Sequence, residues 1–291
     1  MSDSSARDRD AAETESALSR PPVAPDATAA YGSHPDQVID FYAPRDGRTG
    51  APVVVVVHGG AWRAPYDRKH VSPFADFLAR RGFAVASVEY RCGSEIPQQR
   101  GSGPVAGRWP ETFDDVAAAM DALPALLPRE IPQADARRIV VTGHSAGGQL
   151  ALWAAARHVL PEDSPWRLPV PPPLRGVVAL APIADFTTAV ELDVCSGAVG
   201  QFLGREEDFE ARAPHADPAV LLPTGIATTV VQGTTDIDVP QAVSEAFVDA
   251  AAKAGETVGL TLLPGVGHFP LIDPATDACA VVAEELAQLA W

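Results

Sequence analysis

The sequence predicts one α/β domain in which a mostly parallel sheet is covered by helices on both faces. From Gln37 onward, short apolar runs rich in β-branched residues alternate with helix-like stretches. The run Val53–Val57 consists of five valines and ends in glycines, which is typical of a strand buried on both faces. With 291 residues and no visible break, the chain is long enough for one large domain with a sizeable core.

The expected strands and helices follow one another along the chain. The pattern begins with the strand-like run at Gln37–Pro44, and the strands that we mark are Val53–Val57, Phe83–Tyr90, Arg138–Thr142, Gly176–Ala181, Ile226–Gln232 and Val258–Leu263. The helices between them are expected at Val71–Arg81, Thr112–Leu127, Ala146–Leu160, Gln241–Ala254 and Ala275–Ala290. Two long connections, 91–110 and 183–225, follow the carboxyl ends of strands, where α/β sheets bind ligands. We expect both insertions to cover a pocket.

The first 32 residues differ in composition from the rest of the chain. They are rich in acidic residues, Ser, Ala and Pro, and they have neither an apolar face nor the apolar core of a signal peptide. We therefore expect a disordered tail over 1–32 and a single catalytic domain over 33–291. The alternative is a tail that binds a partner.

Charge and composition exclude several classes of partner. The formal net charge of −16 would repel nucleic acid and anionic membranes. No apolar stretch reaches the roughly 18 to 20 residues that a membrane span needs. The three cysteines do not suggest a disulfide framework, and we interpret Cys92 and Cys195 as packing residues rather than nucleophiles. These observations predict a cytoplasmic protein that acts on a small molecule, and they leave its oligomeric state open.

The strongest single motif is Gly-His-Ser-Ala-Gly at 143–147, which contains Ser145. A β-branched run precedes it and an alanine-rich helical stretch follows it, which is the strand–turn–helix context of a nucleophilic serine. Glycines are needed because side chains beside so sharp a turn would collide. The motif predicts Ser145 as a nucleophile at the edge of the sheet, and the alternative is a serine that merely caps the helix.

A nucleophilic serine needs a base and a carboxylate that orients the base. Among the seven histidines, His268 lies in a glycine-containing loop after the last expected strand, as the order Ser, Asp, His requires. Asp236 follows the penultimate expected strand and is our preferred acid. Asp238, in the same loop, is the near competitor for this role, and Asp185, one strand earlier, is the distant one. The alternative role for any of the three is to stabilise a turn or cap a helix.

The motif His-Gly-Gly-Ala-Trp at 58–62 follows the valine strand. Acyl transfer needs backbone N–H groups that stabilise an oxyanion, and glycines leave such groups accessible. We expect the amides of Gly60 and Ala61, with that of Ala146, to form an oxyanion hole. We interpret His58 as structural. Trp62 either lines the substrate pocket or packs the loop.

Together these motifs resemble the α/β-hydrolase superfamily, specifically its esterases with an HGG-type oxyanion loop. The resemblance covers Gln37 to the C-terminus and rests on HGGAW, VEYR, GHSAGG, QGTTDIDVP and GVGHF. It implies a twisted, mostly parallel sheet of about eight strands, with Ser145, Asp236 and His268 as the triad. The HGGxW loop is also similar to that of the kynurenine formamidases (arylformamidases). His144 replaces the Asp that precedes the nucleophile in many HGG esterases.

The sequence therefore predicts a serine hydrolase that needs no cofactor and no metal. Its substrate would be a small carboxylic ester, cleaved through an acyl-enzyme, and the alternative substrate is an aryl formamide. A non-catalytic binding protein on the same scaffold is the alternative from another class.

Overall fold

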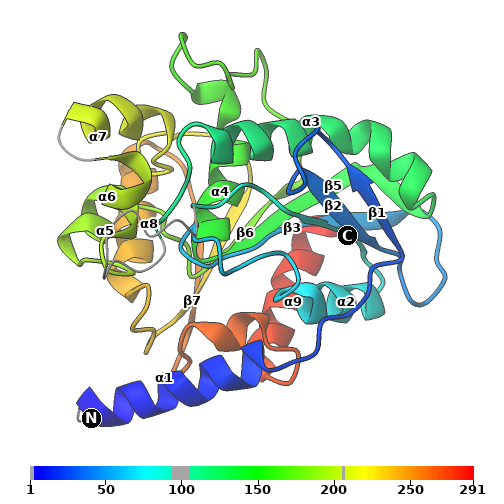
Figure 1. Ribbon diagram of the computed structural model, residues 1–291, viewed down its shortest axis with the longest axis horizontal. Helices are drawn as coiled ribbons and strands as arrows, with labels where there is room; N and C mark the ends of the chain where they lie inside the picture. Colours follow the sequence, from blue (N-terminus) through cyan, green and yellow to red (C-terminus); the bar gives the residue numbers. More distant parts are fainter. Residues whose placement is uncertain (1–2, 94–104, 205–206) are drawn as a thin grey trace.

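The computed structural model describes residues 3–93, 105–204 and 207–291 (Figure 1). Much of the predicted insertion at 91–110 therefore lies outside the described residues. The described parts form one eight-stranded sheet with the order β1-β2-β4-β3-β5-β6-β7-β8. Strand β1 pairs antiparallel with β2, and β2 pairs antiparallel with β4, whereas all other neighbours are parallel. This arrangement confirms the predicted fold class.

The strand bounds agree with the predicted runs in the centre of the sheet and extend some of them. Strand β3 contains the valine run, and all of its residues are buried. The strands are β1 (Ala27–Ala30), β2 (Val38–Tyr42), β3 (Ala51–Val57), β4 (Ala84–Val88), β5 (Ala134–His144), β6 (Gly176–Leu180), β7 (Thr228–Gly233) and β8 (Gly259–Leu263).

Helices cover both faces of the sheet. Alternate valines of β3 point to opposite faces, so they pack against different groups of helices. Val54 and Val56 pack with residues of α2 (Ser72–Arg80) and α9 (Asp277–Ala290). Val53, Val55 and Val57 belong to the other core, which includes residues of α3 (Glu111–Glu130), α4 (Ala146–Ala155) and α8 (Gln241–Lys253). The fully apolar β3 run is thus explained by burial on two faces.

The second predicted insertion forms a group of short helices between β6 and β7. These are α5 (Phe186–Glu191), α6 (Ala198–Leu203), α7 (Glu207–Arg212) and the 3-10 helix η2 (Ala213–His215). They lie together at one end of the molecule (Figure 1). Two further 3-10 turns, η1 (Arg157–Val159) and η3 (Phe269–Ile272), follow α4 and β8.

The N-terminal segment differs from its prediction. Instead of disorder up to residue 32, the structure contains helix α1 (Asp3–Leu18) and the edge strand β1. Helix α1 lies beside η3, which it contacts (Figure 1). Ser16 Oγ donates a hydrogen bond to Asp273 Oδ2, and Arg20 Nε donates to Asp273 Oδ1 at 2.6 Å. Polar contacts of this kind leave no apolar periodicity in the sequence, which is why the prediction failed.

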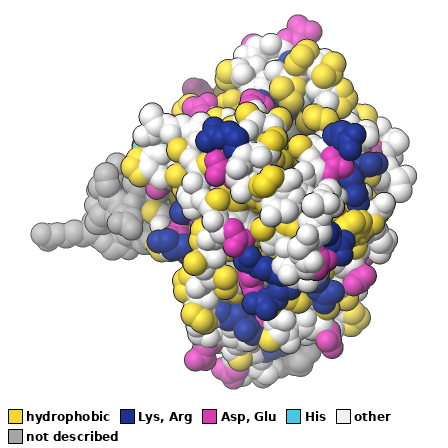
Figure 2. Space-filling model, turned by 90° about the vertical axis from the view of Figure 1, so that its right-hand side faces the viewer, with side chains coloured by type: hydrophobic (Ala, Val, Ile, Leu, Met, Phe, Trp, Pro, Cys, Tyr) yellow, Lys and Arg dark blue, Asp and Glu magenta, His cyan; other side chains and the backbone are white. Residues whose placement is uncertain are grey.

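The negative net charge does not produce a uniformly acidic surface on the face that Figure 2 shows. Lys and Arg side chains lie there among acidic and apolar ones. Within the described ranges, no helix is long and apolar enough to cross a membrane.

Candidate active site

Ser145 lies on the turn between β5 and α4, in a backbone conformation that side chains rarely adopt, with φ 58° and ψ −119°. The turn has no room for larger neighbours. A Cβ on Gly143 would lie 2.1 Å from the carbonyl oxygen of Gly147, and a Cβ on Gly147 would lie 2.1 Å from that of Val57. The Ser145 amide donates to Leu180 O at 2.8 Å, which fixes the turn to β6. The strained conformation is typical of a functional residue.

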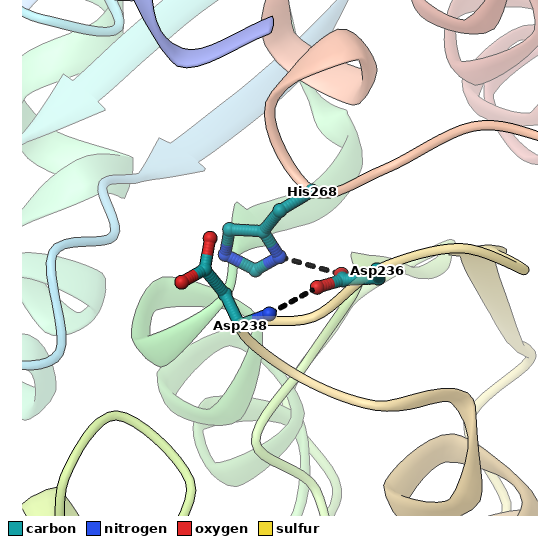
Figure 3. A group of neighbouring side chains, drawn as sticks. All are labelled: Asp236, Asp238 and His268. Carbon is teal, nitrogen blue, oxygen red and sulfur yellow. Dashed lines mark hydrogen bonds and ion pairs between the residues drawn. The ribbon is translucent and has the colours of Figure 1, made fainter. Parts of the chain in front are cut away.

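His268 and Asp236 form a buried pair after the last two strands of the sheet (Figure 3). His268 Nδ1 lies 2.6 Å from Asp236 Oδ2. The other carboxylate oxygen of Asp236 accepts hydrogen bonds from the amides of Asp238 and Val239, each at 2.9 Å. With Nδ1–H donated to Asp236, a neutral imidazole keeps its lone pair on Nε2. The pair therefore has the tautomer that a general base requires.

The structure distinguishes the three acids that the sequence left open. Asp236 is the one that contacts the His268 ring nitrogen. Asp185 instead caps helix α5, where its Oδ1 accepts from the amide of Thr188 at 2.7 Å. Asp238 lies beside the same imidazole but on the edge opposite to Asp236 (Figure 3).

Negative charge around His268 changes its pKa. Burial alone would lower the pKa, but the charge and hydrogen bond of Asp236, with the charges of Asp238 and Asp10, outweigh burial and raise it above 6.5. The pKa of His144 changes in the opposite direction. Burial and the charge of the neighbouring His268 hold the pKa of His144 well below 6.5. His144 Nε2 lies 3.0 Å from the carbonyl oxygen of His268, and a neutral His144 can donate there.

Ser145 and His268 line one cavity of about 340 Å³. No hydrogen bond joins Ser145 Oγ to His268 in the part of the chain that the structure describes, and a serine and its base can approach each other as a substrate is bound. The cavity also includes Cys195, which the sequence analysis interpreted as a packing residue, and residues that it did not single out: Asp10, Thr14, Arg63, Tyr66, His70, Ser196 and Phe269. Asp10 and Thr14 come from α1, and no local sequence signal places that helix beside the nucleophile.

The glycine-rich loop after β3 forms another wall of this cavity. Gly60 and Ala61 both line it, with φ values of 103° and 51°. Gly60 must be glycine, because a Cβ there would lie 2.3 Å from Tyr66 Cβ. Outside helices and strands, neither amide donates to a backbone carbonyl of a described residue. Ala146 is the first residue of α4, where amides have no acceptor within the helix.

Trp62 packs the loop rather than lining the cavity. Its side chain is fully buried, Nε1 donates to Gln149 Oε1 at 3.2 Å, and its ring lies 4.7 Å from that of Phe202. Trp62 is not among the residues that line the cavity with Ser145. Of the two roles expected for Trp62, the structure therefore favours packing over substrate contact.

His58 also belongs to a buried histidine–carboxylate pair, as a structural role requires. Its Nε2 lies 2.8 Å from Glu89 Oε1, and its Nδ1 lies 2.9 Å from Gly59 O. Tyr90 stacks on the ring at 4.2 Å between centroids, and Arg68 contacts Glu89 Oε2 through both its amide and its guanidinium. Both ring nitrogens are thus occupied.

The two cysteines that could be mistaken for nucleophiles are poorly suited to that role. Burial raises the pKa of Cys195, which lines the cavity, to about 12, and burial raises the pKa of Cys92 well above 9.0. Both thiols therefore stay protonated at neutral pH.

One group of described residues has the spacing of metal ligands. Atoms of Asp236, Asp238 and His268 all lie within 4.8 Å of one another. Asp236 already accepts hydrogen bonds from the imidazole and two amides. The group therefore fits proton transfer better than metal binding.

Known proteins with related sequences and structures include several esterases. A family model described as BD-FAE matches residues 39–250, a range that contains Ser145 and Asp236 and ends before His268. The probable isoprenylcysteine alpha-carbonyl methylesterase ICME of Oryza sativa subsp. japonica is 26% identical over 250 residues, which are 82% of this chain and 56% of that protein. Esterase LipC of Mycobacterium tuberculosis is 27% identical over 84% of this chain and 60% of its own length. The chain thus spans less than two thirds of either relative.

Solved structures show the same fold at lower identity. An inhibited esterase B from Lactobacillus rhamnosis matches with a TM-score of 0.74 at 19% identity, covering 98% of this chain and 94% of that one. A truncated carbohydrate esterase from gut microbiota matches with a TM-score of 0.72, also at 19% identity, covering 93% and 99%. The eight-stranded sheet is therefore of the α/β-hydrolase type.

Proposed function

The chain belongs to the BD-FAE family, and we propose that it is a serine esterase that cleaves a small carboxylic ester through an acyl-enzyme. One observation carries the proposal: the strained Ser145 turn and the buried His268–Asp236 pair meet at one cavity. The named esterase relatives support the reaction class.

In the proposed mechanism, His268 Nε2 accepts the Ser145 proton as Oγ attacks the ester carbonyl. The imidazolium then donates that proton to the departing alcohol oxygen, which leaves an acyl group on Ser145. Water repeats the cycle, with His268 again as base, and releases the acid. Asp236 stays ionised throughout and stabilises the imidazolium, which its 2.6 Å contact with Nδ1 permits.

The oxyanion that forms at each attack needs donors fixed in advance. We assign this role to the amides of Gly60, Ala61 and Ala146, since the first two line the cavity with Ser145 and the third follows Ser145 directly. Removal of one such donor typically lowers turnover by about 10²- to 10³-fold.

Labelling with a fluorophosphonate tests the proposal directly. The wild-type protein should become labelled on Ser145 and should hydrolyse p-nitrophenyl acetate or butyrate. Ser145→Ala should lose both properties, because triad members act as a unit. Ser196→Ala is the matched control, since Ser196 lines the same cavity. A folded wild-type protein that is not labelled would favour the non-catalytic binding protein.

Formamide hydrolysis stays a prediction that rests on the HGGxW loop alone, and no relative reported above is a formamidase. The same assay with N-formylkynurenine decides it. Turnover of N-formylkynurenine at a higher kcat/KM than either p-nitrophenyl ester would replace ester hydrolysis with formamide hydrolysis as the main activity.

A further inference from the structure

Helix α1 contributes to the catalytic cavity although it is far from the triad in sequence. Asp10 and Thr14 line the cavity with Ser145 and His268. The helix is fixed at several points: Arg9 donates to Thr235 O at 2.7 Å, and Ser16 and Arg20 both bind Asp273. The helix is therefore a wall of the cavity, and Asp10 faces the reaction space.

Asp238 supplies a second carboxylate to the same side of the cavity. Figure 3 shows it beside the imidazole edge that faces away from Asp236, next to the ring nitrogen that would exchange protons with substrate. Atoms of Asp238 and His268 that could bind a ligand lie within 4.8 Å of each other. Asp238 therefore lies close to the place where a substrate alcohol would receive its proton from His268.

Neither carboxylate forms a direct ion pair with a Lys or Arg side chain of the described residues, although the charges of His268 and Arg9 act to lower the pKa of Asp10 and that of His268 acts to lower the pKa of Asp238. Asp10 Oδ1 is buried and has no hydrogen-bond partner. Burial raises the pKa of both groups, and each also feels the negative charge of Asp236. Two such carboxylates facing one cavity would be stabilised by a positively charged ligand.

Two aromatic side chains line the same cavity. Tyr66 and Phe269 line the cavity with the two carboxylates. Faces of such rings attract ammonium groups, and quaternary ammonium groups in particular. Arg63 also lines the cavity, but its guanidinium donates to Cys195 O at 2.7 Å and to Gln201 Oε1 at 3.3 Å. Arg63 thus contacts the insertion between β6 and β7.

We propose that Asp10 and Asp238 make this enzyme prefer esters whose alcohol carries an ammonium group. The inference rests on the proposed esterase function and narrows its substrate class. In the enzyme–substrate complex, the two carboxylates beside His268 bind the ammonium group of the alcohol while the ester carbonyl lies at Ser145 Oγ. Water and the ester then yield the free acid and the cationic alcohol, and no other reactant is needed.

A pair of isosteric esters tests this preference. Acetylcholine and 3,3-dimethylbutyl acetate differ only in a charged nitrogen against a neutral carbon, and a pH-stat follows acid release from both. The wild-type kcat/KM ratio of the charged to the neutral ester should exceed about ten, and it should fall as salt is added. A ratio near one would overturn the proposal.

Charge-neutralising variants locate the effect. Asp10→Asn and Asp238→Asn should each lower the ratio by about five- to tenfold, the size expected when one charge is lost beside a partly buried cation. Asp8→Asn is the matched control, because Asp8 is an exposed carboxylate on the same helix and does not line the cavity. The ratio should not change in Asp8→Asn. An unchanged ratio in both Asp10→Asn and Asp238→Asn would refute the assignment.

A binding measurement separates this inference from the proposed function. Choline should bind to the Ser145→Ala protein more tightly than 3,3-dimethylbutanol in calorimetry, and Asp10→Asn should remove most of the difference. Binding of choline without hydrolysis of any ester would leave the cation site in place and reject the esterase. Hydrolysis of the neutral ester without selective choline binding would do the opposite.

Discussion

Two buried histidine–carboxylate pairs follow strands on either side of β5, the strand that leads into Ser145, and only one of them has the arrangement that the proposed catalysis needs. His58–Glu89 and His268–Asp236 have similar contact distances, 2.8 and 2.6 Å. In the first pair both ring nitrogens are bonded, and Arg68 also binds the carboxylate. In the second pair, Nε2 remains available and the ring lines the cavity with Ser145.

The difference teaches that burial and a carboxylate partner do not make a histidine a base. The function of a ring depends on what its second nitrogen faces. His58 faces the backbone and Tyr90, so it fixes the start of the oxyanion loop. The ring of His268 instead lines the cavity that it shares with Ser145.

Replacement of His268 should have the largest effect. His268→Gln should lower kcat for p-nitrophenyl acetate by about 10⁴- to 10⁶-fold, because the nucleophile loses its base. Steady-state kinetics measure the loss, and circular dichroism checks folding. His58→Gln is the matched control and should keep measurable turnover in molecules that fold. Equal losses in the two folded variants would erase the distinction.

Replacement of the triad acid should have a smaller effect. Asp236→Asn should lower kcat by about 10³- to 10⁴-fold, since an amide no longer holds the imidazole in the required tautomer. The comparison is Glu89→Gln, which should leave kcat within about tenfold of the wild type. If Asp236→Asn retained full activity, Asp238 would be the operative acid.

Replacement of Glu89 should cost more stability than replacement of Asp236, although it should cost less activity. Glu89→Gln should lower the free energy of unfolding by about 3 kcal/mol, because it breaks a buried pair and leaves Arg68 with less charge to bind. Urea denaturation monitored by fluorescence measures the change. A loss below about 1 kcal/mol would mean that water replaces these contacts.

The two histidine–carboxylate pairs should lose their contributions to folding stability in different pH ranges. Burial would raise the pKa of Glu89, but the charge and hydrogen bond of His58, with the contacts of Arg68, lower it to about 2. Its stabilising contribution is therefore complete above about pH 4.5 and is lost as pH falls toward 2. The raised pKa of His268 means that its contribution is complete below pH 6.5 and is lost as pH rises through the raised value.

The pH dependence of kcat/KM should follow the ionisation of His268 alone. Because the neutral ring is the base, kcat/KM should fall as pH decreases through a pKa above 6.5. A pH–rate profile measures that pKa, and Asp238→Asn should move it to lower pH by removing one of the negative charges that raise it. An acid limb at or below pH 6.5 in the wild type would contradict this account.

The smallest effect is expected at Tyr90. Its hydroxyl donates to His58 O at 2.8 Å, so Tyr90→Phe should cost about 1 kcal/mol of stability while keeping the stacked ring. Thermal denaturation checks the value. A large fall in kcat would show that the position of His58 controls the oxyanion loop more tightly than we infer.

Sequence patterns predicted the central sheet and brought together the catalytic candidates. The valine run of β3 and the strand–turn–helix at Ser145 carry local signals, because burial on both faces and a tight turn restrict which residues fit. The sequence favoured Asp236 over Asp238 but did not exclude Asp238, since both lie in one loop and only the path of that loop determines which carboxylate meets Nδ1.

Long-range polar contacts were beyond prediction from sequence. Helix α1 is held by Arg9, Ser16 and Arg20 through partners more than 200 residues away, so no periodic apolar face marks it. The role of Trp62 was also ambiguous, because tryptophan suits both a pocket wall and a packed loop. Its burial against Phe202 distinguishes the two.

The separate origin of α1 bears on how selectivity in this scaffold can be altered. The proposed nucleophile, base and acid all lie in loops that follow strands of the sheet, whereas one wall of the cavity comes from helix α1. An engineer could exchange that single helix for a library of others, anchored at Asp273, and screen for new leaving groups without disturbing the machinery that breaks the bond.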